Sequence, residues 1–315
     1  MMSNFLPSLS CIKSYLIINV PLIIIGNLFD LSLHLTLQTV SIMSPVIATL
    51  LKMIIFGAKN FILLFGIDFL TKARPDIIER VGVESSEELP FNQSRWKSAI
   101  SSVTTFTFLE TGTYDIASVM GLISISSQKD YMTMGGIIYC ALSFFGYFII
   151  TSFVVEIIFD FFHYWAHRFL HYQPDLYRSL HSLHHHNSNP TVYHTFNDSI
   201  CGTLVTNTIP HILALFIFSS LFRRPITHSE HSLLLVYKTF VEVSGHSGKE
   251  LGKASSFPQF KWLPIFFGIE LHASDHHSHH RNSKTNFSKR FVLWDKVFQT
   301  YLLRPKSNEK DRLNK

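Results

Sequence analysis

The feature that most constrains the fold of this chain is a set of long windows without Asp, Glu, Lys or Arg. The windows at 31–51, 131–155 and 199–222 each exceed the roughly 20 residues that a helix needs to cross a bilayer core. Only 16% of the 315 residues are charged, and soluble helices rarely lack charge over such lengths. We therefore predict membrane helices over 131–162 and 199–222 instead of helices buried in a soluble core.

Histidine divides the chain, because only His34 of its 18 histidines precedes residue 163. We expect residues 1–130 to be an N-terminal membrane-associated region with a polar connection. Residues 131–302 form the expected catalytic domain, because they hold the histidine motifs, and 303–315 form a basic tail. The predicted fold is all-α, an integral membrane helical bundle with a histidine-rich cap on the cytoplasmic side.

The net charge of +5 does not indicate a nucleic-acid partner, because the basic residues are not gathered in one patch with aromatic platforms. They crowd into the C-terminal third, and the positive-inside rule places such segments on the cytoplasmic face. If 199–222 enters the membrane, the charged residues between 226 and 243 make a full return crossing difficult. We therefore predict a hairpin that turns near Arg223–Pro225.

Three segments gather histidines at helical spacing. One holds histidines four residues apart, and two repeat the i, i+3, i+4 spacing that brings side chains to one helical face. In chain order they are His163, His167 and His171; His181, His184 and His185; and His276, His279 and His280. A lone histidine is ordinarily a core or surface residue, but neutral imidazole is the commonest metal ligand among side chains. The repeated triplets therefore predict a metal site.

The number of imidazoles bears on the number of ions. Eight histidines from these segments exceed the four ligands of a structural zinc site, which favours two ions or a much looser site. Imidazole suits iron, zinc, copper and nickel alike, so the ligand type does not select the metal. The remaining histidines lack partners at ligand spacing and are not assigned to the site: His34, His211, His228 and His231.

The motifs around these histidines resemble the fatty acid hydroxylase/sterol desaturase superfamily over about residues 131–302. The residues that carry the resemblance are "HYWAHRFLHY" from His163, "LYRSLHSLHH" from Leu176, Pro190, "GHSG" from Gly245, and "DHHSHHRNSKTNFSKRFVLWDKVFQT" from Asp275. In motif detail the sequence is most similar to the sterol C4-methyl oxidase branch. The resemblance implies an integral membrane, non-haem di-iron oxygenase that uses O2 to hydroxylate or desaturate a lipid, with a sterol as the expected substrate.

Carried over residue by residue, the resemblance assigns nine metal ligands: His167, His171, His181, His184, His185, His246, His276, His279 and His280. The sterol oxidase branch has a further histidine soon after its His-Ser-Gly element, and this chain lacks it. We predict that His272, four residues before His276, supplies the missing ligand and makes a set of ten. The expected cofactor is two iron ions, and zinc is an alternative occupant of the purified protein.

Five further residues are expected beside the ligands without binding metal. Asp160 precedes His163 by three residues and His167 by seven, which places it on their face, where its carboxylate could orient an imidazole through the second N–H. The others flank or precede the triplets: His163, His186, His194 and His277.

No Gly-x-Gly-x-x-Gly fingerprint follows a strand, so electrons are expected from outside the chain. The resemblance implies a b-type cytochrome or an NAD(P)H-dependent reductase as the donor, and an endoplasmic reticulum membrane with the histidines facing the cytoplasm. Two alternatives stay open. One is a fatty-acid or sphingolipid hydroxylase that shares the site but not the substrate channel, and the other is a non-catalytic zinc carrier or sensor.

Overall fold

The computed structural model describes residues 9–39, 44–73, 78–80, 93–124, 134–186, 190–247, 249–251 and 256–302. The tail at 303–315 and most of the polar connection before α3 lie outside these residues. The long helices are α1 (Leu9–Thr39), α2 (Pro45–Ala73), α3 (Gln93–Val119), α4 (Met134–Tyr172), α7 (Ile209–Phe222) and α8 (His228–Gly245).

The shorter elements surround the histidines. They are α5 (Pro174–Leu176), η1 (Tyr177–His181), η2 (His184–His186), η3 (Val192–His194), α6 (Ile200–Thr203), η4 (Leu204–Thr208), η5 (Pro258–Phe260), α9 (Trp262–Phe266), α10 (Ala273–Arg281) and α11 (Leu293–Val297). Strands within the described residues are two short pairs, β1 (Ile78–Arg80) with β4 (Lys249–Leu251), antiparallel, and β2 (Ile123–Ser124) with β3 (Ile226–Thr227), parallel. The all-α prediction is confirmed.

Four helical segments of the described residues are long and apolar enough to span a bilayer: Ile12–Thr39, Pro45–Leu70, Phe144–Tyr172 and Ile200–Phe222. The chain is an integral membrane protein. Helix α4 continues ten residues past the predicted end at 162 and stops before Pro174, whose ring prevents its continuation. The charge-free window at 31–51 is not one span, because α1 ends at Thr39 and α2 begins at Pro45.

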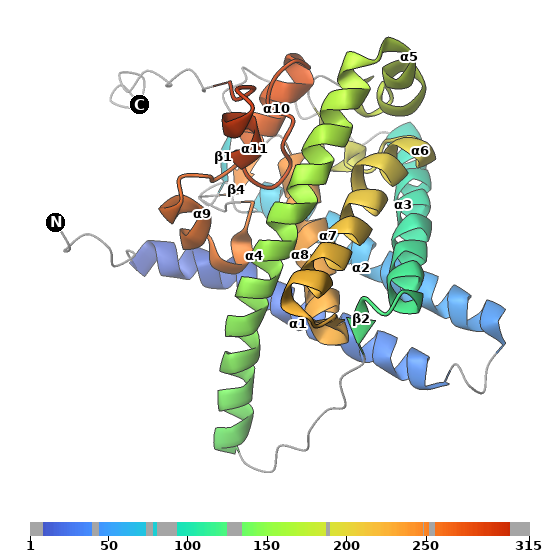
Figure 1. Cartoon of the computed structure of the whole chain (residues 1–315), viewed down its shortest axis with the longest axis vertical. Helices are drawn as coiled ribbons and strands as arrows, with labels where there is room; N and C mark the ends of the chain where they lie inside the picture. The colour runs from blue at the N-terminus through green and yellow to red at the C-terminus, as the bar shows by residue number, and fades with distance from the viewer. Residues whose placement is uncertain are drawn as a thin grey trace.

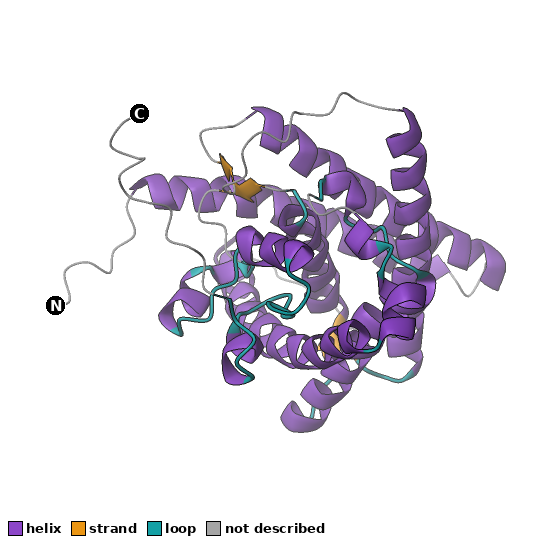
Figure 2. Cartoon of the chain, turned by 90° about the horizontal axis from the view of Figure 1, so that it is seen from above, coloured by secondary structure: helices purple, strands orange, loops and turns teal. Residues whose placement is uncertain are grey.

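The long helices share one apolar core. Leu33 of α1, Phe56 of α2, Phe148 of α4, Leu215 of α7 and Leu234 of α8 are all fully buried in the same cluster. The N-terminal helices therefore pack directly against the histidine-bearing part of the chain. Figure 1 shows α4 running the height of the molecule with α5 and α10 near its upper end, and Figure 2 shows the helices from above.

The hairpin turns where the sequence predicts it. Helix α7 ends at Phe222, Arg223 adopts a left-handed conformation with φ 52°, and α8 begins at His228. Thr227 caps α8 in a reciprocal pair with Glu230, which satisfies two backbone N–H groups of the first turn. Arg224 pairs with the same Glu230 carboxylate at 3.0 and 3.1 Å and also donates to Thr151 of α4. These hydrogen bonds connect the turn between α7 and α8 to α4.

Candidate metal centre

Helix α4 presents His167 and His171 one turn apart near its C-terminal end. The Nδ1 atom of His167 donates to the carbonyl of Phe287 at 2.8 Å. A backbone carbonyl only accepts, so a neutral His167 carries its proton on Nδ1 and offers a lone pair at Nε2. The Nε2 atoms of His167 and His171 lie 3.2 Å apart.

The "HSLHHH" stretch is not one regular α-helix. His181 ends the π-helix η1, and His184 and His185 begin the 3₁₀ segment η2. Ser199 holds this corner by donating to the Leu180 carbonyl at 2.7 Å. Gly202 lies so close that a Cβ there would be 2.2 Å from the same carbonyl oxygen, so only glycine fits. The change of helical type directs neighbouring histidines to different places.

Helix α10 carries the last triplet, and α8 carries His246 at its C-terminal end. His279 donates from Nδ1 to the Thr285 carbonyl at 2.7 Å. His246 donates from Nδ1 to the Glu242 carbonyl at 2.8 Å. The last carbonyls of a helix lack intrahelical partners, so His246 satisfies one of them and turns its Nε2 outward.

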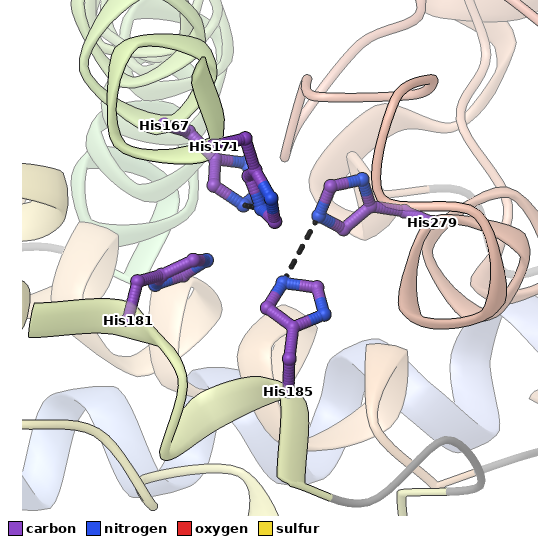
Figure 3. A group of neighbouring side chains, drawn as sticks. All are labelled: His167, His171, His181, His185 and His279. Atoms are coloured by element: carbon purple, nitrogen blue, oxygen red, sulfur yellow. Dashed lines mark hydrogen bonds between the residues drawn. The ribbon is translucent and has the colours of Figure 1, made fainter. Parts of the chain in front are cut away.

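The structure gathers nine of the ten predicted ligands into two groups. The first is His167, His171, His181, His185 and His279, and the second is His184, His246, His276 and His280. Within each group the candidate ligand atoms lie within 4.8 Å of one another. Figure 3 shows the five rings of the first group arranged around a common centre, contributed by α4, the η1–η2 segment and α10.

The nitrogen separations fit a metal. The Nε2 atoms of His279 and His185 are 3.2 Å apart, and those of His246 are 3.0 and 3.4 Å from His276 and His184. Two imidazoles bound about 2.1 Å from one ion at neighbouring coordination positions have nitrogens roughly 3.0 to 3.4 Å apart. A histidine-only donor set suits iron, zinc, copper or nickel, so the residues present fit two such ions.

These histidines are neutral at physiological pH. Burial, with repulsion from neighbouring imidazoles, holds the pKa of His184 and His276 well below the usual value. Burial lowers the pKa of His279 to about 4 and that of His280 to about 2. Metal ligation requires unprotonated nitrogen, so the same burial that disfavours imidazolium prepares the rings to bind a cation.

His272 lies outside both groups. It is the N-cap of α10 with an extended backbone, φ −117° and ψ 158°, and its Nε2 is 3.3 Å from a Glu270 carboxylate oxygen. The prediction extended the face of His276 back by one helical turn. Because the helix begins only at Ala273, that projection does not apply, and the structure does not place His272 with the other nine.

Asp160 has a different role from the predicted one. Its carboxylate accepts the backbone N–H groups of Lys289, Arg290 and Phe291 at 2.7 to 3.0 Å, and it contacts no ligand imidazole by a hydrogen bond. Asp160 therefore fixes the loop after α10. That loop includes the Phe287 carbonyl that orients His167, so its influence on the site is indirect.

The other four accessory histidines lie outside both groups and have different surroundings. His163 donates from Nδ1 to the Thr206 carbonyl at 2.7 Å, an acceptor left available because Pro210 has no N–H to offer it. His194 completes the cap of η3 with Thr191, and His186 is exposed. His277 is buried, and neither of its ring nitrogens finds a hydrogen-bond partner among the described residues.

Sequence reasoning missed Asp295. Its carboxylate accepts the N–H groups of Phe287 and Ser288, both at 2.8 Å, and the hydroxyl of Thr300 at 2.7 Å. It thereby holds the residue whose carbonyl orients His167. The Trp-Asp pair at 294–295 is the one sequence signal that marks it, because it belongs to the motif that carries the resemblance.

A cavity adjoins the histidines. Its lining includes His167 and His181 of the first group, His184 and His276 of the second, and the rings of Phe106 and Phe196. Lys289 lines it too, with its charge paired to Glu242 at 2.7 Å. The lining thus combines metal-binding groups with aromatic rings, as ligand sites commonly combine polar and apolar groups.

Comparison with known proteins agrees with this geometry. Residues 152–300 match the family model described as fatty acid hydroxylase. A fatty acid hydroxylase of Lecanicillium sp is 30% identical over 155 residues, 48% of this chain and 42% of that protein. A C-4 methylsterol oxidase of Schizosaccharomyces pombe is 32% identical over 152 residues, 45% of this chain and 43% of that protein.

A sphingolipid C4-hydroxylase of Saccharomyces cerevisiae is 29% identical over 206 residues, 59% of this chain and 54% of that protein. The chain spans about half the length of the curated relatives it matches. No solved structure matches it significantly. The matched residues include all nine grouped histidines, and residues 152–300 of this chain form a region of the fatty acid hydroxylase family.

Proposed function

We propose that this chain is a membrane-bound, non-haem di-iron oxygenase that uses O2 and external electrons to hydroxylate or desaturate a lipid. The observation that carries the proposal is the pair of histidine groups. In each of them at least one ring is fixed by a backbone carbonyl so that Nε2 is a lone-pair donor. Such fixed tautomers are typical of metal ligands.

The nine grouped histidines are the proposed ligands, with one group for each ion. Two bound iron ions would supply the oxidising power to break an unactivated C–H bond. The chain itself holds the ions, positions the lipid and excludes water. Its aromatic walls Phe106 and Phe196 stack at 4.4 Å and form the apolar side of the cavity beside the centre.

A lipid substrate is supported by the four candidate spans, which put the centre within reach of molecules dissolved in the bilayer. A sterol is the substrate that we propose. The relatives include methylsterol oxidases and sphingolipid hydroxylases at about 30% identity, so a sphingolipid or fatty acid is the alternative. A cytochrome or reductase on the cytoplasmic side, in the endoplasmic reticulum, is the proposed electron source.

Metal analysis combined with reductant-driven O2 uptake on anaerobically purified protein tests this proposal. We expect iron in the protein and O2 consumption that depends on added lipid, with a sterol, sphinganine and stearic acid compared side by side. His279→Ala should remove both signals. His228→Ala is the matched control, because His228 is buried but pairs with Asp30 and Tyr114 away from the centre. Stoichiometric zinc without O2 uptake would instead support the zinc carrier or sensor.

A further inference from the structure

A second cavity, lined mostly by buried residues, lies among α3, the α6–η4–α7 segment and α8. It shares three lining residues with the cavity at the histidine groups, Phe106, Thr203 and Asn207. The two cavities therefore adjoin each other and share part of their lining. The second one contains none of the nine grouped histidines, and the proposed chemistry does not account for it.

Its polar lining includes a hydrogen-bonded series of two buried histidines and a partly buried lysine. His211 of α7 and His231 of α8 bring their Nε2 atoms within 3.0 Å, and the Lys238 ammonium nitrogen is 3.4 Å from Nδ1 of His211. His231 and Lys238 are seven residues apart on α8 and so face the same way. All three line the cavity, and the two histidine rings are at most 3% exposed.

The hydrogen-bonded series of Lys238, His211 and His231 ends at a ring nitrogen that has no hydrogen-bond partner among the described residues. Nδ1 of His231 is buried and makes no hydrogen bond to any described residue. Leaving a buried polar atom unmatched is costly, about 1 to 3 kcal/mol. A polar group of a bound molecule would remove that cost. The unmatched atom is the second, independent feature beside the cavity that indicates a ligand.

The positions of the protons along the Lys238–His211–His231 hydrogen bonds indicate which functional group of a ligand fits beside His231. When Lys238 donates to His211, His211 must donate from Nε2 to His231, and His231 then carries its proton on Nδ1. When Lys238 is neutral and accepts, every bond reverses and Nδ1 of His231 becomes an acceptor. Burial lowers the pKa of Lys238 to about 7, so both arrangements are accessible. A hydroxyl group, which both donates and accepts, matches either one.

A carboxylate matches less well. The Glu110 carboxylate also lines the cavity, with its own charge satisfied by Lys59 at 2.6 Å and Asn60 at 3.0 Å. A second carboxylate would need several donors to offset its desolvation. Lys238 is already engaged with His211 and lies 4.0 Å from the centre of the Phe159 ring.

We propose that the second cavity binds the hydroxyl group of a lipid alcohol through His231, while the carbon to be oxidised lies in the adjoining cavity at the histidine groups. The class of ligand follows from the His211–His231–Lys238 chain, and its assignment as the substrate rests on the proposed function. The bound hydroxyl would then determine which carbon of the lipid lies at the histidine groups, because the shared lining residues fix the two cavities relative to each other.

Photolabelling of the full chain in lipid nanodiscs tests the site directly. The probe is a long-chain alcohol bearing a diazirine, compared with the carboxylic acid of the same length. We expect the alcohol to label the 203–211 or 231–238 segments, to be displaced by octadecanol or cholesterol, and to bind better than the acid. Equal or stronger labelling by the acid, or labelling elsewhere on the chain, overturns the proposal.

Two substitutions at one position separate recognition from folding. An asparagine amide occupies the place of Nδ1, whereas a glutamine amide occupies the place of Nε2. His231→Asn should therefore keep alcohol binding, and His231→Gln, which retains the contact with His211, should weaken it roughly tenfold. His228→Gln, one turn earlier on α8, is the control and should bind as the wild type. Equal weakening by both His231 variants overturns the role of Nδ1.

Photolabelling measures binding of the alcohol whether or not the protein catalyses a reaction. His279→Ala should retain alcohol labelling while losing metal, which shows that the second cavity functions independently of the centre. Alcohol binding in a protein that never consumes O2 would overturn the proposed function and support the binding site. O2 consumption with no alcohol labelling in the second cavity would do the opposite.

Discussion

The protein buries two kinds of histidine cluster that look alike by distance and differ in what holds the rings. At the metal centre, His246 and His276 have Nε2 atoms 3.0 Å apart, and so do His211 and His231 between α7 and α8. His246 is fixed through Nδ1 by a backbone carbonyl, which only accepts. His211 instead meets Lys238, a group that can donate or accept.

This difference decides what each cluster can do. A carbonyl partner leaves one tautomer, so Nε2 presents a permanent lone pair to a cation. A lysine partner leaves two arrangements, so the pair has no fixed lone pair and suits a ligand that can both donate and accept. Proximity of imidazoles is thus not sufficient to predict a metal site, and the partner of the second ring nitrogen distinguishes the two functions that we propose.

The largest expected effect comes from removing one ligand of either group. His279→Ala or His184→Ala should reduce lipid-dependent O2 uptake to background and lower the metal content measured by mass spectrometry, because an ion loses a ligand. His211→Ala should keep its metal. Equal metal loss in His211→Ala would show that the mutations unfold the chain, or that both clusters bind metal, and the comparison would fail.

A smaller loss, of metal affinity, is expected when the backbone carbonyl that orients a ligand histidine is held less firmly. Asp295→Asn weakens the hold on Phe287, whose carbonyl orients His167. We expect metal affinity to fall by about ten- to hundredfold, as is usual when such supporting groups are altered. Competition with a chelator measures it, and Lys296→Gln is the adjacent control. An unchanged affinity would mean that the carbonyl is not needed to orient the ring.

Removal of the metal should lower the stability of the folded protein as well as its activity. Metal at 100 to 1,000 times its dissociation constant stabilises the folded state by about 3 to 4 kcal/mol. Chelation should therefore lower the thermal unfolding temperature of the wild type. A variant with His279 and His280 both replaced by alanine should show little further decrease, whereas the His231 variants should respond like the wild type.

The smallest effect is expected at His272. His272→Ala should retain its metal, and its free energy of unfolding should fall by less than about 1 kcal/mol, because the contact with Glu270 is partly exposed. Metal counting on the purified variant checks this. A loss of metal comparable to that of His279→Ala would restore His272 as a tenth ligand.

Much of the site was predictable because it depends on local spacing. The His-x3-His of α4 falls on one helical face, and both His-x2-His-His motifs contribute to the groups as expected. The pairing of His211 with His231 was not predictable, since 20 residues and a turn separate them. Asp160 was assigned to an imidazole, whereas the N–H groups that its carboxylate accepts come from a loop about 130 residues later.

The sequence alone determined the all-α class, the apolar spans and the three segments that hold eight of the nine grouped histidines, since these follow from helical periodicity and the absence of charge. The tertiary structure decided how the histidines divide. His181 and His185 join one group and His184 the other, and His279 separates from His276 and His280 in the same manner. The change from π to 3₁₀ geometry after His181 sets the first of these divisions, and the start of α10 only at Ala273 leaves His272 outside both groups. Both depend on contacts with distant segments, such as the Ser199 hydroxyl on the Leu180 carbonyl, that helical spacing does not encode.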